Sequence, residues 1–371
     1  MNNNIDTNVK KEGIVVLKTL DTLTINSIAK NVAQVLCSTF PEQNLNYNEI
    51  FINLSRLNMY VAEMPKDMSV AKYYYKNSSI YLSNTVNLNH INKCLIHECI
   101  HALQTKKDDK NNIINFGLCN MNNSKAPGMA LNEASVQLIA ESCMKSKKDS
   151  VKYFGLDLST ISPDYYPLEC ALLEQVSYIV GQNILVHSTF TGDNSFENTF
   201  INLTSKKCFS TFRKNLDIIM NLEDDISFFN SKLENGVVNS KKALKIAKDI
   251  SNLKKIIANI FIKTQDLIIT EYFNNYLSKI NTSKDIENLR NKLYSYKDYI
   301  GTTDDYAFYN EYYLKMMTNL EKKYSELEKG TTNYELPTVY REKTINIIIN
   351  KIKKIFTQNN YSDYYYNEKN K

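Results

Sequence analysis

The sequence lacks the features that mark exported and membrane proteins. No apolar run approaches the roughly 20 residues that a membrane-spanning helix needs. The polar N-terminus has neither the apolar core nor the small-residue cleavage site of a secretory signal. Tryptophan is absent, but a hydrophobic content of 43% is enough for a packed core, which excludes a disordered chain. We therefore expect a folded cytoplasmic protein without a membrane span.

Paired cysteines and strong charge are also missing. The seven cysteines form no CxxC pair and no even framework, so free thiols in a reducing compartment fit best. The net charge is only +5 and is spread over many residues, which is too weak to predict nucleic-acid binding. These two absences argue against a disulfide-stapled secreted domain and against a nucleic-acid partner.

The spacing of apolar residues predicts a mixed first half. Helical spacing covers residues 23–38, and segments rich in β-branched and aromatic residues follow. We expect these segments to be strands at 48–55, 56–64 and 71–83, the last of them a hairpin that turns at 77–79. Further helices are expected at 89–104, 129–146 and 164–187.

The sequence beyond about residue 196 changes character, because it is Lys-rich and helical almost throughout. Helices are expected at 240–280, 283–299, 305–329 and 340–358. The pattern predicts an α+β fold in which a small mixed or antiparallel sheet precedes a motif helix and a mainly α-helical C-terminal region follows. We place the two regions at 1–200 and 201–371.

The most informative stretch is CLIHECIHALQ at 94–104, which holds two of only four histidines. On a helix His97 and His101 lie on the same face, so both imidazoles can reach one metal ion. Glu98 lies about 100° around the helix, where a carboxylate can reach a metal-bound water as a general base. With so few histidines, chance would give this spacing in on the order of a few per thousand chains. The alternative is a pair of core histidines satisfied by hydrogen bonds.

A catalytic zinc site needs a third protein ligand and an open position. The candidate is Glu133, on the helix that follows the turn at 127–128. That helix is largely apolar, which argues against a merely solvated glutamate. Glu141, two turns further along on roughly the same face, is the reserve candidate.

An alternative set of zinc ligands would imply a different function. Cys94, His97, His101 and Cys119 could form a closed Cys2His2 site that holds the fold and leaves no place for water. The chain would then be a non-enzymatic binding or effector protein. Against this alternative, Glu98 would have no role.

With these motifs the sequence resembles the gluzincins, zinc-dependent metallopeptidases that pair HExxH on one helix with a glutamate on a later helix. HECIH at 97–101 matches the first motif, and LNEASVQ at 131–137 matches the second loosely. The similarity covers roughly residues 45–187, and the helical remainder resembles no family.

The resemblance implies a zincin-like domain that hydrolyses peptide bonds in a peptide or protein substrate. One zinc ion per chain would be held by His97, His101 and Glu133, with Glu98 as the general base. The edge strand of the sheet, expected within 71–83, would bind the extended substrate by strand addition. The oligomeric state is not predicted.

Two departures from the thermolysin-like members stand out. Where those members have an aspartate that holds the first histidine, this chain has Gln137, whose amide oxygen can accept the bond but brings no charge. They also use a downstream histidine or tyrosine to stabilise the oxyanion. His187, the last histidine of the chain, is the candidate for that role, and Tyr178 is the other.

Overall fold

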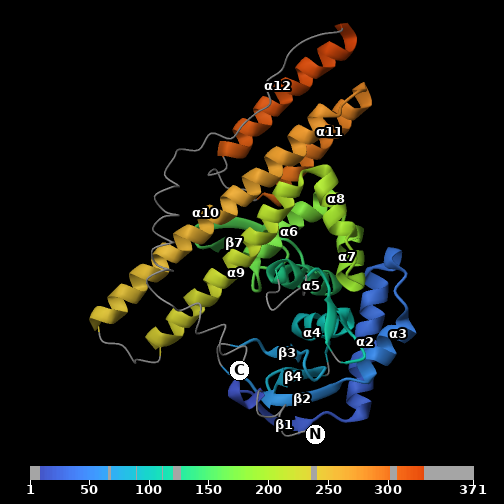
Figure 1. Ribbon diagram of the computed structural model, residues 1–371, viewed down its shortest axis with the longest axis vertical. Coiled ribbons are helices and arrows are strands. Elements are labelled where there is room, and N and C mark those ends of the chain that lie inside the picture. The colour runs from blue at the N-terminus through green and yellow to red at the C-terminus, as the bar shows by residue number, and fades with distance from the viewer. Residues whose placement is uncertain are drawn as a thin grey trace.

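A four-stranded sheet lies at one end of the molecule, and long helices extend away from it (Figure 1). The computed structural model describes residues 9–65, 68–88, 90–110, 112–119, 127–234, 240–300 and 307–329. The expected helix at 340–358 lies outside these residues. The described chain is α+β, as predicted.

The sheet is mixed and has the order β1-β2-β4-β3. β2 pairs in parallel with β4, whereas the β1–β2 and β3–β4 pairs are antiparallel. The expected hairpin at 71–83 is confirmed as β3 and β4, and β3 forms one edge of the sheet. The strand bounds are β1 Val15–Thr19, β2 Asn58–Glu63, β3 Ala71–Tyr74 and β4 Ser79–Ser83.

The segment expected to be a strand at 48–55 is instead a helix, α3 (Tyr47–Ser55). Its start is fixed by Asn46, whose side-chain oxygen accepts the backbone N–H groups of residues 48 and 49. Ile50 and Leu54, four residues apart, then bury one face of a helix. The strand prediction was wrong because it followed β-branched composition, which a helix cap and helical burial outweigh. Beside α3 lie α2 (Thr22–Thr39), which confirms the expected helix, and the short 3-10 helix η1 (Pro41–Gln43).

The motif helix is α4 (Lys93–Gln104), which begins where Asn92 accepts the N–H of Leu95. A short hairpin follows it directly, in a stretch for which the sequence predicted no helix or strand. Next comes α5, the second motif helix, and a second hairpin. Their bounds are β5 Thr105–Lys107, β6 Ile113–Phe116, α5 Met129–Cys143, β7 Asp149–Tyr153 and β8 Leu156–Thr160.

The helix expected at 164–187 is broken into α6 (Pro167–Val180) and α7 (Gln182–Thr191). The break lies at Gly181, which has φ 109° and closes α6 by donating its N–H to Ser177. Glycine tolerates this backbone conformation, so α7 can leave α6 at a new angle.

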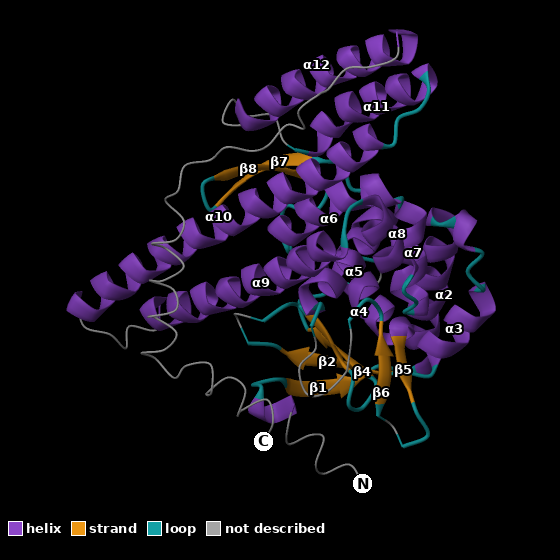
Figure 2. Cartoon of the chain, turned by 45° about the horizontal axis from the view of Figure 1, so that its top comes forward, coloured by secondary structure: helices purple, strands orange, loops and turns teal. Residues whose placement is uncertain are grey.

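The remaining helices form the long arm of the molecule, in which α9 and α10 run side by side (Figures 1 and 2). One hydrophobic core extends from α5 and α6 through this arm to α12. The boundary expected at 200/201 falls inside α8. In the described residues no helix is long and apolar enough to cross a membrane. The bounds are α8 Ser195–Leu203, α9 Lys206–Glu234, α10 Ser240–Ser278, α11 Ser283–Ser295, η2 Tyr296–Tyr299 and α12 Ala307–Lys329.

Candidate metal centre

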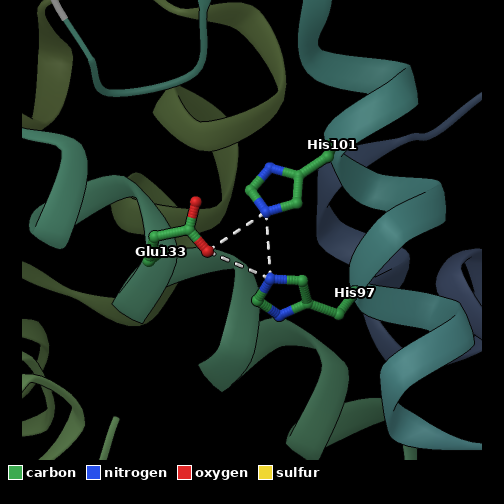
Figure 3. Close-up of side chains that lie close together, drawn as sticks. All are labelled: His97, His101 and Glu133. Atoms are coloured by element: carbon green, nitrogen blue, oxygen red, sulfur yellow. Dashed lines mark hydrogen bonds and ion pairs between the residues drawn. The ribbon is translucent and has the colours of Figure 1, made fainter. Parts of the chain in front are cut away.

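The three predicted metal ligands come together between α4 and α5 (Figure 3). The Nε2 atoms of His97 and His101 are 2.9 Å apart. Oε2 of Glu133 lies 3.2 Å from the first nitrogen and 3.3 Å from the second. Within the described residues, these three are the histidine, cysteine and carboxylate side chains whose ligand atoms converge closely enough to hold a metal.

The spacing of the three atoms fits a metal ion. The point equidistant from them is about 1.8 Å from each, while zinc sits about 2.0–2.1 Å from histidine nitrogen and carboxylate oxygen. The three atoms are therefore close enough together for His97, His101 and Glu133 to hold a single ion. Both histidine side chains are under a tenth exposed, but that of Glu133 is 17% exposed, so one side of the site is open to water.

The electrostatics of the triad favour a charged Glu133. Burial opposes ionisation of its carboxyl, but His101 and His97 outweigh burial and hold the pKa well below its usual range. An ionised carboxylate between two imidazole nitrogens is the donor set that zinc accepts.

A series of hydrogen-bonded polar groups contacts the Nδ1 atom of His97. Its Nδ1 lies 2.9 Å from Oε1 of Gln137 on α5. The amide nitrogen of Gln137 donates to Glu141, which also pairs with Lys93 at 3.2 Å. Gln137 thus accepts the bond that the sequence predicted for it. Glu141, the reserve candidate for the third ligand, instead lies at the end of this hydrogen-bonded series, where it pairs with Lys93.

His101 is held by its own helix and by the β5–β6 hairpin. Its Nδ1 lies 2.8 Å from the side-chain amide of Gln104, three residues further along α4. The ring of Phe116 stacks on its imidazole, with centroids 5.3 Å apart and planes within 4°. These contacts fix the ring orientation and leave Nε2 facing Glu133.

Glu98 is buried beside the triad and faces the edge strand of the sheet. Its carboxylate accepts the backbone N–H of Tyr73 on β3 at 2.6 Å. Burial raises the pKa of Glu98 to about 7, against the opposing charge of His97 and the Tyr73 N–H. A carboxyl with a pKa near neutrality can both take and return a proton.

Tyr166, which the sequence did not single out, is the further side chain at this centre. Its ring stacks on His97 at 6.2 Å, and its hydroxyl is close enough to the carboxylate of Glu133 to interact with that charge. The negative charge of Glu133, followed by burial, raises the pKa of Tyr166 well above its usual value. Its backbone is left-handed, with φ 50° and ψ 45°, a strained conformation that non-glycine residues seldom adopt. Its one sequence signal, a position directly before Pro167, does not point to a functional site.

The structure does not bring the two expected oxyanion candidates to the triad. His187 lies on α7, is half exposed and sits 3.2 Å from the carboxylate of Asp193. Tyr178 donates its hydroxyl to the carbonyl of Lys292 at 3.3 Å. Both side chains are thus engaged elsewhere, and the tyrosine that lies beside the triad is Tyr166.

The cysteines of the alternative Cys2His2 site also have other partners. Cys94 donates to the hydroxyl of Tyr165, with 3.6 Å between sulfur and oxygen, and Cys119 donates to the carbonyl of Pro127. Burial raises the pKa of Cys119 to about 12, which disfavours the thiolate that zinc needs. The converging ligand atoms are those of two histidines and a glutamate instead.

Comparison with family models, with curated proteins and with solved structures gave no match for this chain.

Proposed function

We propose that this protein is a zinc-dependent peptidase with a zincin-like catalytic half. The observation that carries the proposal is the convergence of His97, His101 and Glu133 with the buried carboxylate of Glu98 next to them. Two imidazoles and one carboxylate are the ligands of catalytic zinc sites, which keep one position open. A zinc ion bound there would lower the pKa of a water and polarise the substrate carbonyl.

Glu98 is the general base of the proposed reaction. Its carboxylate takes the proton of the attacking water and returns it to the leaving amine. The raised pKa supports both steps, because a carboxyl of ordinary pKa would be a poor acid for the second. During both steps the N–H of Tyr73 orients the carboxylate of Glu98.

Tyr166 is the proposed oxyanion donor. Its hydroxyl already lies against the ligand Glu133, and its high pKa keeps it protonated as a hydrogen-bond donor. A single oxyanion donor contributes on the order of 10²–10³ in kcat in hydrolases of this general kind.

The edge strand β3 is the proposed substrate platform. It pairs with β4 on one side, and its Tyr73 N–H points the other way, toward Glu98. An extended peptide added along this edge would pass the base and the metal centre. This arrangement supports a peptide over a compact small molecule as the substrate.

The test combines bound zinc per chain with cleavage of a mixture of peptides, followed by mass spectrometry. Wild type should hold about one zinc and cleave, and Glu98→Gln should keep the zinc and lose cleavage. Loss of zinc from Cys94→Ser or Cys119→Ser would favour the structural site instead. Zinc binding without cleavage of any peptide, in wild type, would refute the peptidase and leave a metal-binding protein.

A further inference from the structure

The amide group of Gln104 stands between His101 and a second buried amide. Gln104 is fully buried at the end of α4, with its nitrogen placed toward Nδ1 of His101. Its Oε1 atom and Nδ2 of Asn132 are both buried, and neither has a hydrogen-bond partner among the described residues. Unsatisfied buried amides cost stability, so this orientation of the pair is unfavourable.

Gly117 marks the place where the two amides meet. A Cβ atom at this position would lie 2.3 Å from Oε1 of Gln104 and 2.2 Å from Oδ1 of Asn132. The two oxygens therefore lie within about 4.5 Å of each other beside the glycine, and neither can donate a hydrogen bond. Oδ1 of Asn132 cannot be exchanged with the nitrogen at no cost, because it accepts the N–H of Leu118 at 3.0 Å.

Metal binding imposes a second requirement on the same amide. When Nε2 of a histidine ligates a metal, Nδ1 carries the proton and needs an acceptor. For His97 the acceptor is in place, since Oε1 of Gln137 faces Nδ1. For His101 the amide of Gln104 has to present oxygen rather than nitrogen.

We propose that Gln104 is the positioning residue of His101, with its oxygen on Nδ1–H and its NH2 group on Asn132. Turning this one amide gives Nδ1–H of His101 an acceptor and leaves the NH2 group of Gln104 beside Oδ1 of Asn132, while Gly117 leaves the space for it. Oxygen and nitrogen of a side-chain amide are assigned from such networks, so the turn changes no atom positions. The inference rests on the metal site of the proposed function, not on the reaction.

The experiment measures zinc affinity of the full chain by competition with a chelator, together with the visible spectrum of the cobalt-loaded protein. Gln104→Leu should lower the affinity by roughly 10–100-fold and alter the cobalt spectrum, the usual cost of losing such a partner. Gln104→Glu should stay within a few-fold of wild type, because a carboxylate also accepts from Nδ1–H. Gln175→Leu is the matched control, as Gln175 is a buried glutamine that accepts from Tyr296 on the far side of α6.

Each outcome decides a different point. Wild-type affinity and spectrum in Gln104→Leu would overturn the positioning role, as would a loss in Gln104→Glu equal to that in leucine. Gln104→Met, which keeps the shape without the amide, replaces the leucine variant if that variant does not fold. Zinc binding with no peptide cleavage would refute only the peptidase, whereas a wild type that binds no zinc would refute both.

Discussion

Two groups of buried carboxylates in this protein have contrasting partners. At the metal centre Glu133 faces two imidazoles and Glu98 accepts a backbone N–H. Between α6 and α9, Glu169 is completely buried, and neither of its oxygens has a partner within the described residues. Burial raises the pKa of Glu169 well above its usual value and that of its neighbour Glu223 to about 7.

The difference teaches which buried acids keep their charge. Glu133 stays ionised because two imidazoles replace the water that it lost, whereas the single N–H on Glu98 does not offset burial, which raises the pKa of Glu98 to about 7. Glu169 and Glu223 can hydrogen-bond to each other only while one of them keeps its proton. We infer that the first group serves metal binding, while the second makes the α6–α9 contact sensitive to pH.

The largest effect is expected from Glu133→Ala, which removes the central partnered carboxylate. Zinc affinity should fall by more than the roughly 10–100-fold that an outer partner contributes, and any cleavage should disappear with the metal. Chelator competition measures the affinity, and Glu287→Ala, at an exposed position of α11, is the control. Full zinc in Glu133→Ala would mean that another side chain is the third ligand.

Tyr166→Phe tests the hydroxyl that lies near the carboxylate of Glu133. The rate of peptide cleavage should fall by on the order of 10²–10³, the cost of one oxyanion donor, while zinc affinity changes less than tenfold. Tyr165→Phe removes the neighbouring hydroxyl, which bonds to Cys94 instead, and should leave the rate unchanged. An unchanged rate in Tyr166→Phe would assign the oxyanion to another group.

Asp217→Ala breaks a partnered carboxylate that links the helical arm to the metal centre. Asp217 on α9 accepts the N–H groups of Gly128 and Ala130, the start of the helix that presents Glu133. We expect a loss of about 1–2 kcal/mol in the free energy of unfolding, as for other helix caps, and a weaker hold on zinc. Asp21→Ala removes a cap from α2 and should cost similar stability without a change in zinc affinity. If the two variants bound zinc equally well, the contact of Asp217 with the start of α5 would have no influence on the metal site.

The ligands of the metal centre could be predicted because they follow a local rule. His97 and His101 share a helix face by spacing alone, and Glu133 needed only one further packed helix. Gln104 follows His101 by three residues and lies on the same face, so a signal for its role was present in the sequence. The strands within 56–64 and 71–83 were likewise predicted from local composition, and the helical arm from periodicity.

The rest depends on contacts that no local pattern contains. Tyr166 reaches the centre because its strained backbone and the fold of α6 place it there. The β5–β6 hairpin carries Phe116 to His101, but its strands are short, and β5 is entirely polar, so the sequence carries no strand signal there. Asp217 caps a helix almost ninety residues earlier in the chain, a contact set by packing of α9 alone.

The smallest expected effect is the sharpest test of the comparison, because its size should depend on pH. The carboxyl of Glu169 has a folded-state pKa above its unfolded value of about 4.5. Its penalty is therefore absent below pH 4.5 and grows as the pH rises toward the folded pKa. Glu169→Gln removes this acid and supplies an NH2 donor to Glu223. It should raise the free energy of unfolding by roughly 1 kcal/mol at pH 8 and have little effect at pH 4.

Glu174→Gln is the matched variant, five residues further along the same helix. Glu174 is also buried, but it accepts the hydroxyl of Thr160 and the N–H of Ile161, and lies 3.5 Å from Lys148. Its amide should destabilise the protein by about 1 kcal/mol at pH 8, since one oxygen is replaced by a donor that faces a lysine. Chemical unfolding at both pH values measures the two variants. Destabilisation by Glu169→Gln at pH 8 would show that the unpartnered acid is charged and paired after all, and the contrast between the two groups would fail.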